Sequence, residues 1–469
     1  MIELSLLAAA DAGASDIVKP VFPMIVLGAI MTVTFVAIAF DWVHKSVAAL
    51  AGALAAVSAA MILGVFKDAD GRSAYDRAVH DIIGHDIGVI GVIIGTSVLV
   101  EIVGRSGLFH FLAVKIVKQT QGDPGRLLLL LMAATMGFVT FLTIAPGTLI
   151  MVSLTLVVTR ELNLPPKPYV IAVAIVANSG ALMTFASGIC TLMLGTAGRL
   201  PYVHFFLVST PMAFVSGWIA YEVIRRYYRA ELVSTLDPVE RLRKVEAFDE
   251  WALVKDRRLF YRCAGLLGAT IVGFATAKQL GVGLDFIAFA GGTAALLLSG
   301  IYPDEAIKKV NWSMILFFIG LFVIIGAVQE TGLLAWQANK MIELSGGSPM
   351  GALMMLTSFT MLMSGIVDNI PVAATLIPVV RSMEMQGLPG EPLWWCLVLA
   401  CNLGGNSTPI GSVSSVIALN AMEKERQIKV GWGEFFKVGG SILAIQTIAV
   451  FAQLFVYQYF NLFPMRPTS

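Results

Sequence analysis

The chain has 469 residues, of which 57% are hydrophobic and only 13% charged, and its formal net charge is +1. Its mean hydropathy is +0.81, a value outside the range of soluble globular proteins, so the composition indicates a membrane protein with many spans. The basic residues form no stripe, which argues against a nucleic-acid partner. No Walker sequence GxxxxGK[ST] occurs and the four cysteines lack zinc-site spacing, so we expect neither an enzyme nor a metal cofactor.

Apolar stretches long enough to cross a hydrocarbon core of ~30 Å follow one another along the chain. In chain order they cover 21–40, 46–66, 87–104, 127–159, 168–195, 203–224, 260–277, 284–300, 311–328, 350–380, 392–419 and 435–460. Two of them, 127–159 and 350–380, carry a proline break near the middle and are too short for two full crossings. We interpret both as re-entrant hairpins, whose tips must lie inside the protein because backbone outside a helix needs internal partners or a wet cavity. The sequence therefore predicts an all-α polytopic membrane protein with about ten transmembrane helices and two re-entrant hairpins.

An internal repeat relates the two halves of the chain. At an offset of 225, Ser106 to Leu108 align with Thr331 to Leu333, Pro124 with Pro349 and Pro146 with Pro371. At an offset of 224, Asn178, Gly180 and Thr184 align with Asn402, Gly404 and Thr408. Each half therefore carries one hairpin followed by one discontinuous helix.

The repeat divides the chain into four parts. We expect N-terminal helices and a connector in 1–86, a first repeat in 87–225, a cytoplasmic linker with two scaffold helices in 226–310, and a second repeat in 311–460. The discontinuous helices are 168–195 and 392–419, with unwound centres expected at 178–188 and 402–412.

The distribution of lysine and arginine predicts the orientation. With this number of crossings, the loops on one side hold 23 of the 32 basic residues, so the positive-inside rule places that side in the cytoplasm. Both termini then lie outside, the linker 226–259 is cytoplasmic, and the two hairpins enter from opposite faces. Inverted repeats with broken helices are typical of secondary transporters. We expect a multi-pass protein of the inner (plasma) membrane that contacts membrane lipid.

An ionisable side chain interrupts the second hairpin at Asp368, followed by Asn369 and Pro371. An acid at bilayer depth costs at least ~2.5 kcal/mol, so it is tolerated mainly where it meets a partner, water or an ion. This placement favours an ion-binding or transport site. The alternative is a structural aspartate that caps the helix beginning near Pro371.

Polar clusters at the breaks are the other candidates for the site. In the second half they are Asn402, Gly404, Gly405, Asn406, Ser407 and Thr408; in the first half they are Thr143, Asn178, Ser179, Gly180, Thr184 and Ser187. Neutral oxygens of this kind can coordinate Na⁺, possible ligands being Asn178, Asn402 and Thr408. Pro371 and Pro409 each suit the first turn of a new half-helix, whose amides attract an anion. The alternative is that these side chains only bond to backbone or to neighbouring helices.

Two sequences of the second half, SGIVDNIPVAATLIPVV at 364–380 and CNLGGNSTPIGSVSSVIAL at 401–419, resemble the ion transporter superfamily. This group contains citrate-transporter-like permeases, arsenite permeases, the melanosomal P protein and some sodium/proton antiporters. The resemblance implies inverted repeats, frequent homodimers and an elevator-like motion. It implies site roles for Asp368, Asn369, Asn402, Gly404, Gly405, Asn406 and Thr408. The first half departs from the pattern, with Thr143-Ile144 at its hairpin tip.

These observations predict a secondary active transporter that moves a small ion or organic anion, coupled to H⁺ or Na⁺ and without another cofactor. Three alternatives remain at this point: a monovalent cation/H⁺ antiporter, a passive channel, and a transport-inactive membrane scaffold or assembly factor. Each would use the same fold, because the polar groups at the breaks can serve either a cation or an oxyanion.

Overall fold

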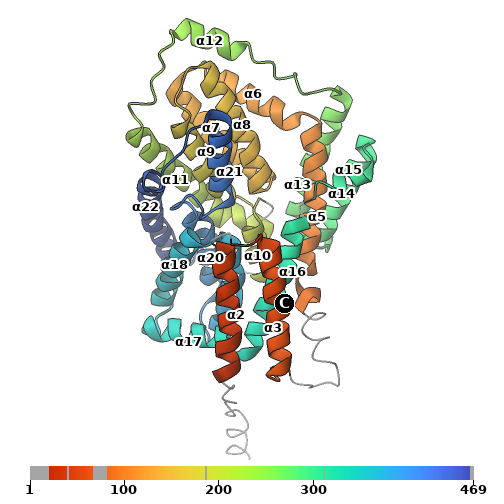
Figure 1. Cartoon of the computed structure of the whole chain (residues 1–469), viewed down its shortest axis with the longest axis vertical. Helices are drawn as coiled ribbons and strands as arrows, with labels where there is room; N and C mark the ends of the chain where they lie inside the picture. The colour runs from red at the N-terminus through yellow and green to blue at the C-terminus, as the bar shows by residue number, and fades with distance from the viewer. Residues whose placement is uncertain (1–20, 40–41, 67–81, 185–186, 311, 465–469) are drawn as a thin grey trace, which may run out of the picture.

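A computed structural model describes residues 21–39, 42–66, 82–184, 187–310 and 312–464. Within these ranges the chain forms helices and no strands (Figure 1). The helices are α2 (Val21–Ala39), α3 (Lys45–Ile62), α5 (Ile82–Arg105), α6 (Leu108–Gln119), α7 (Pro124–Phe141), α8 (Ile144–Glu161), α9 (Lys167–Gly180), α10 (Ile189–Ala197), α11 (Tyr202–Tyr227), α12 (Pro238–Glu246), α13 (Arg257–Leu280), α14 (Leu284–Ser299), α15 (Pro303–Ile307), α16 (Trp312–Thr331), α17 (Leu333–Leu344), α18 (Pro349–Ile366), α19 (Asn369–Met385), α20 (Gly390–Gly404), α21 (Val413–Arg426) and α22 (Trp432–Tyr459).

Among the described residues, ten helices are long and apolar enough to cross a membrane. This confirms the expected all-α polytopic membrane protein. The hairpins lie close to the predicted ranges: α7 and α8 form the first, and α18 and α19 form the second. Most of the acidic connector expected between 67 and 86 lies outside the described residues.

The helix boundaries repeat at the offset found in the sequence. The helices α6, α7 and α8 begin at Leu108, Pro124 and Ile144, and the same offset of 225 leads to the first residues of α17, α18 and α19. In Figure 1, α6, α7 and α8 occupy the upper part of the molecule, whereas α17 and α18 occupy the lower part. The two halves thus enter from opposite ends, as an inverted repeat requires.

Matching local signals start the corresponding helices. Gly107 before α6 and Gly332 before α17 adopt left-handed backbone angles, with φ of 81° and 83°, a conformation that glycine adopts without steric cost. The caps of the hairpins also match, because Asp123 accepts a hydrogen bond from the Arg126 amide and Ser348 accepts one from the Gly351 amide. A proline follows each cap residue, which suits the first helical position.

The two halves exchange helices at their closest crossings. Helix α14 packs along α5, and α3 packs along α16. A Cβ on Gly95 of α5 would lie 2.4 Å from the backbone of Ala288, and one on Gly320 of α16 would lie 2.6 Å from the backbone of Ala49. Gly95 and Gly320 are themselves related by the repeat offset, so each repeat uses one glycine to receive a helix of the other half. The helix pairs α2–α3 and α13–α14 therefore play equivalent roles, and this packing favours extending each predicted repeat by its preceding pair.

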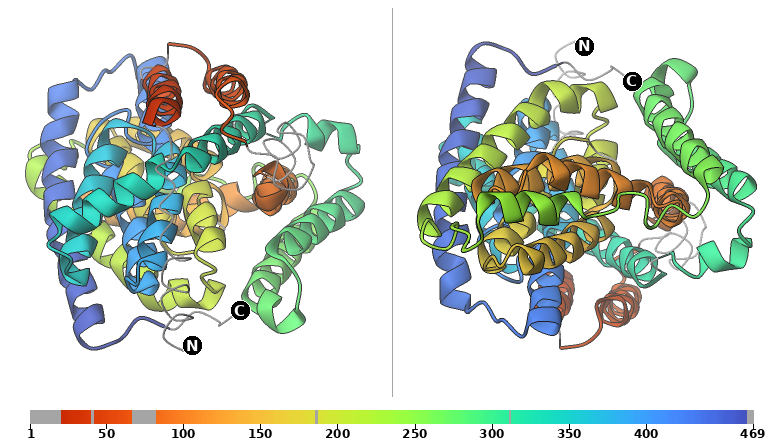
Figure 2. Two further views of the ribbon diagram at one scale, coloured as in Figure 1. Left: turned by 90° about the horizontal axis from the view of Figure 1, so that it is seen from below. Right: turned by 90° about the horizontal axis from the view of Figure 1, so that it is seen from above.

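A central group of helices carries the breaks, and an outer group surrounds it. Figure 2, viewed along the long axis, places α2–α3, α13–α14 and α22 on the outside. Every residue of α9 after Lys167 is buried, and every residue of α20 except Glu391. Helices that are apolar on all sides belong in a protein interior, so α9 and α20 form the centre of each half.

Candidate functional site

Both hairpin tips consist of two extended residues between helices. Leu142 and Thr143 separate α7 from α8, and Val367 and Asp368 separate α18 from α19. One cavity of about 260 Å³ touches Thr143 from the first tip and Asn369 from the second. Because the hairpins enter from opposite ends, two tips on one cavity must each stop inside the protein.

The discontinuous helices break later in the chain than the sequence predicted. Helix α9 continues to Gly180 and α20 to Gly404, so Asn178 and Asn402 lie in the last helical turns rather than in the unwound segments. The breaks cover 181–188 and 405–412, apart from 185–186, which lie outside the described residues. The expectation that Pro409 starts a half-helix is wrong, because α21 begins at Val413, after Ser412 caps it.

The glycine before each break lies where two helices cross. A Cβ on Gly180 would lie 2.8 Å from the carbonyl oxygen of Met136 in α7, and one on Gly404 would lie 2.6 Å from that of Met361 in α18. Met136 and Met361 are again related by the repeat offset. Gly180 and Gly404 are thus required for close approach of the broken helix to the hairpin. Gly405 is similarly confined, since its Cβ would lie 2.6 Å from the Gly411 carbonyl oxygen.

A threonine in each break holds the end of the adjacent hairpin arm. Thr184 Oγ1 donates to the Thr140 carbonyl at 3.0 Å, and Thr408 Oγ1 donates to the Gly365 carbonyl at 2.7 Å. These carbonyls lie in the last turns of α7 and α18, where the helix leaves such groups without partners. The two threonines therefore join each tip to its broken helix.

A buried chain of amides and hydroxyls crosses the interface between the halves. Asn178 Nδ2 donates to Asn406 Oδ1 at 2.8 Å, and Asn406 Nδ2 donates to Gln446 Oε1 of α22 at 3.0 Å. Gln446 Nε2 donates to Ser216 Oγ of α11 at 2.7 Å, and that hydroxyl lies 2.6 Å from Ser179 Oγ. All five side chains are fully buried. Such a satisfied network fixes the relative position of the helices that it joins.

Asn402 makes the matching contact from the other half. Its Nδ2 donates to Thr191 Oγ1 of α10 at 3.1 Å and to the Val398 carbonyl at 2.8 Å. Asn178 correspondingly accepts a hydrogen bond from Ser414 Oγ of α21 at 3.3 Å. Each asparagine thus binds the first turn of the half-helix that belongs to the other repeat.

Four helix N-termini converge on the cavity between the tips, which we call the tip cavity. The first turns of α8, α19, α10 and α21 line it, together with α5, Lys309 and Met314. The residues before α8, α19 and α10 make no side-chain cap. Helix N-termini carry partial positive charge and free amides, so this geometry attracts an anion. Thr96, Ser97 and Glu101 of α5 add polar groups on the opposite wall.

Asp368 forms an ion pair with a residue far away in the sequence. Its Oδ2 lies 3.0 Å from Nζ of Lys45, the first residue of α3, and 11% of its side chain is exposed. Its Oδ1 is buried, with no hydrogen-bond partner among the described residues. Asp368 occupies the cap position of α19 but makes no cap, so the capping alternative is not the contact observed.

The predicted residues thus form two groups. Thr143 and Asn369 line the tip cavity. Asn178, Ser179, Asn402, Asn406 and Thr408 join helices, while Ser187 donates to the Ala181 carbonyl at 2.7 Å and Ser407 to the Gly404 carbonyl at 3.1 Å. Whether any of them holds Na⁺ stays a prediction.

Sequence reasoning missed the partners of these residues. They are Lys45, Thr191, Ser216, Lys309 and Gln446. Gln446 alone carried a detectable signal, since it is an amide within an otherwise apolar span. Lys45 and Lys309 lie at helix ends, where a basic residue is expected on orientation grounds alone.

Comparisons with known proteins agree with this architecture. The chain is 27% identical over 436 residues to an uncharacterized transporter of Mycobacterium bovis, covering 92% of this chain and 98% of that protein. It is 26% identical over 498 residues to the mouse P protein, covering 88% of this chain and 58% of that protein, and 27% identical over 405 residues to the magnetosome protein MamN of Magnetospirillum gryphiswaldense, covering 84% and 87%.

The fold has a counterpart among solved structures. The YdaH transporter of Alcanivorax borkumensis matches with a TM-score of 0.62 at 16% identity, covering 91% of this chain and all of that one. The sequence also matches the citrate transporter family, CitMHS, over residues 35–400, a range that includes both hairpin tips and most of the tip cavity. The chain is therefore a membrane transporter rather than an enzyme, and it belongs to the CitMHS citrate transporter family.

Proposed function

We propose that the protein is a secondary active carrier of a small organic anion, of the di- or tricarboxylate class, and that it couples this movement to Na⁺ or H⁺ at Asp368. The observation that carries the proposal is the convergence of four helix N-termini on the tip cavity. A cavity of about 260 Å³ is of the size that holds a small ligand.

The charges around the tip cavity favour an anion. Lys309 contributes a full positive charge, and the uncapped starts of α8, α10 and α19 contribute backbone amides. Glu101, the acidic residue at the wall, hydrogen-bonds to Arg105 at 2.7 Å, so its charge is compensated. The amides and Lys309 together favour a carboxylate ligand over a metal cation.

The coupling ion has a separate candidate ligand. Asp368 directly precedes Asn369 of the tip cavity, so a cation bound at this carboxylate would lie close to the anion. Binding the two together lowers the cost of removing either charge from water. This proximity is the physical basis that we propose for coupling.

Alternating access follows from the position of the tip cavity. It lies between α5 of the outer group and the two hairpins of the central group, so a sliding motion of the central group would open it first to one side and then to the other. We therefore propose an elevator-type mechanism in the inner membrane, with both termini outside, the linker 226–259 in the cytoplasm and a homodimer as the assembly.

The Lys45–Asp368 pair favours a second candidate function, a monovalent cation/H⁺ antiporter. One buried carboxylate can exchange H⁺ for Na⁺ without any anion. The polar tip cavity has no role in that mechanism, which is why we place it second.

The test is uptake into proteoliposomes under an imposed Na⁺ or pH gradient. Citrate, dicarboxylates and arsenite are offered as labelled solutes, and Na⁺ and Li⁺ are followed as exchange ions. The proposal expects gradient-driven uptake of a carboxylate that is lost in Asp368→Asn. Asp304→Asn is the matched control, because Asp304 is an exposed acid in α15.

The other outcomes separate the alternatives. Collapse of a pH gradient on adding Na⁺, with no carboxylate uptake, selects the antiporter. Flux without saturable counterflow selects a passive channel. Absence of flux for every solute in folded protein favours the transport-inactive scaffold and contradicts the proposal.

A further inference from the structure

The ion pair between Lys45 and Asp368 joins helix α3 to the second hairpin, two elements that otherwise contact each other little. Lys45 begins α3, which packs along α16 and beside α2. Asp368 lies at the tip of the second hairpin, whose arms pack on α17 and α20. The two residues are 323 positions apart, and Nζ lies 3.0 Å from Oδ2. The pair is therefore a contact between the outer group and the hairpin tip.

Neither residue is placed where its own helix stabilises its charge. A carboxylate at an N-cap normally accepts from the first amides of its helix, yet Asp368 makes no such bond. A lysine at the first position of a helix lies at the positive end of the dipole, where a cation is disfavoured, and Lys45 holds this position in α3. Each charge is instead compensated by the other.

The exposure of the two side chains is unequal. The Asp368 side chain is 11% exposed, whereas that of Lys45 is 44% exposed. Lys45 can thus withdraw its ammonium group into water by rotating a flexible stem. Asp368 has no comparable route, and its Oδ1 is already buried without a partner among the described residues. A replacement cation would find one carboxylate oxygen unoccupied and the other vacated.

We propose that Lys45 is a tethered competitor of Na⁺ at Asp368, so that the carboxylate holds either the ammonium group or the metal cation. The reason is charge balance: one buried carboxylate compensates one positive charge, and a second unpaired charge at the same place has a large desolvation cost. Lys45 would hold the second hairpin against α3 when the site lacks Na⁺, and Na⁺ binding would release the hairpin. This inference rests on the proposed function, because it needs Asp368 to bind the cation.

The test measures Na⁺ binding through protein stability, without any transported anion. The thermal midpoint of the purified full-length protein is followed against NaCl at constant ionic strength, with choline chloride as the balancing salt. Lys45→Gln removes the competing charge and keeps a side chain of similar length. Its half-saturating Na⁺ concentration is expected to be about tenfold lower than that of the wild type, which corresponds to ~1.4 kcal/mol. Lys45→Arg keeps the charge and is expected to behave like the wild type.

A matched control removes another lysine from an ion pair. Lys429→Gln breaks the surface pair with Glu423, which has a Nζ to Oε1 distance of 2.8 Å and lies away from the hairpin tips. This variant is expected to leave the Na⁺ response unchanged. Asp368→Asn is expected to abolish the response, both alone and combined with Lys45→Gln.

Two results would overturn the inference. If Lys45→Gln and the wild type respond at the same Na⁺ concentration while Asp368→Asn has lost the response, the cation site stands and Lys45 does not compete. If no variant responds to Na⁺, the competition fails as well, and the uptake assay then decides separately whether the protein is an H⁺-coupled carrier. Loss of folding in Lys45→Gln, seen by gel filtration, is separated from both results by Lys45→Arg.

Discussion

The two hairpins share one framework but differ at both ends. At the tips, Thr143 of the first hairpin corresponds to Asp368 of the second, so only the second tip carries a charge. At the outer ends, α6 is covered and α17 is bare. Phe111 of α6 stacks against Trp251 and Phe260 with ring centroids 4.6 and 5.2 Å apart. Its counterpart in α17, Trp336, is 49% exposed.

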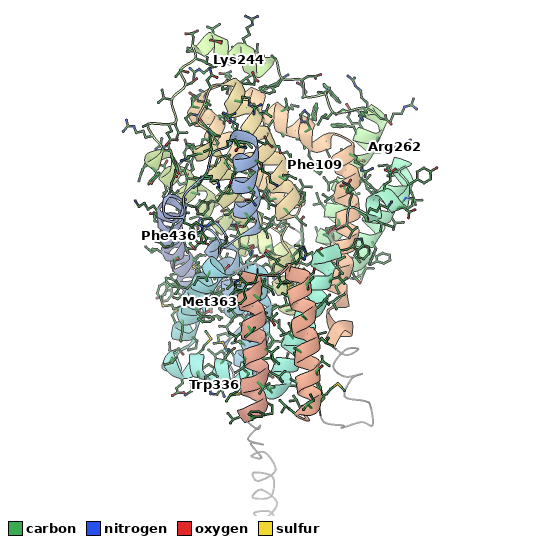
Figure 3. The ribbon with its side chains drawn as sticks, viewed as in Figure 1. Phe109, Lys244, Arg262, Trp336, Met363 and Phe436 are labelled. Carbon is green, nitrogen blue, oxygen red and sulfur yellow. The ribbon has the colours of Figure 1, made fainter. Side chains whose placement is uncertain are left out.

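The linker between the halves causes this difference at the outer ends. Lys118 of α6 pairs with Glu250 of the linker, and Lys244 Nζ of α12 donates to the Glu161 carbonyl at the end of α8, at 2.9 Å. Figure 3 labels Lys244 at the upper end of the molecule, over the first hairpin, and Trp336 at the lower end, where no linker passes. The comparison teaches that the first hairpin is fastened from outside, while the charged second hairpin is the one left free to move.

The largest expected difference lies between the tips. Asp368→Asn is expected to reduce gradient-driven uptake by roughly a hundredfold, because loss of the charge removes ~2.7 kcal/mol of cation binding. Thr143→Val, which removes one hydroxyl from the tip cavity, is expected to reduce uptake by less than about tenfold. Initial uptake rates in proteoliposomes measure both. Equal losses would mean that the two tips do the same work, which contradicts the comparison.

The crossing glycines test how alike the two frameworks are. Gly404→Ala and Gly180→Ala both place a Cβ within 3.0 Å of a backbone carbonyl, at 2.6 and 2.8 Å. Each is expected to lower the free energy of unfolding by ~1–3 kcal/mol, as overpacking does, with Gly404→Ala the more severe. Thermal midpoints of purified protein provide the measurement. Gly440→Ala, whose nearest neighbours are the tip of the Phe436 ring at 3.7 Å or more, is the control and should change little.

The outer ends are compared with a pair of tryptophan variants. Trp251→Ala uncovers Phe111 and is expected to cost about 2 kcal/mol, whereas Trp336→Ala is expected to stay within about 0.5 kcal/mol. Hydrogen exchange gives a local readout, with faster exchange expected in α6 after Trp251→Ala. If α6 and α17 already exchange equally fast in the wild type, the linker does not fasten the first hairpin.

The threonine contacts should give smaller and nearly equal effects. Thr184→Val and Thr408→Val each remove one hydrogen bond to a hairpin carbonyl, so each is expected to lower the free energy of unfolding by ~1 kcal/mol. Chemical or thermal unfolding of purified protein measures this loss. A large effect of Thr408→Val on uptake, without a matching loss of stability, would instead assign Thr408 to ligand binding.

The smallest effect concerns acid. Lys118 hydrogen-bonds to Glu250 and holds the pKa of this carboxyl below its ordinary value. A group with a lowered folded-state pKa stabilises the fold above its unfolded pKa and loses this contribution as the pH falls through the folded value. The linker contact on α6 should therefore weaken only in acid, below the ordinary carboxyl range. Hydrogen exchange of 247–256 should rise there, and Glu250→Gln should remove the dependence.

The local pattern of the sequence was sufficient for much of the fold. Spans, hairpin breaks and the internal repeat depend on runs of apolar residues and on prolines and glycines, and the helix starts at Pro124 and Pro349 follow them. The site residues Thr143 and Asn369 could be predicted for the same reason, because a tip is defined by a local break. The predicted unwinding at Asn178 and Asn402 was wrong, since their side chains find partners on other helices and the backbone stays helical to the following glycine.

The sequence by itself thus determined an inverted-repeat membrane transporter with one charged hairpin tip, because helix propensity, hydrophobicity and backbone breaks act over a few residues. Only the tertiary structure decided which groups meet. The Lys45–Asp368 pair, the bond from Asn178 to Asn406 and the cover of Trp251 on Phe111 join residues 323, 228 and 140 positions apart. No local pattern specifies such contacts, because they depend on how the helices of the two halves pack across one another.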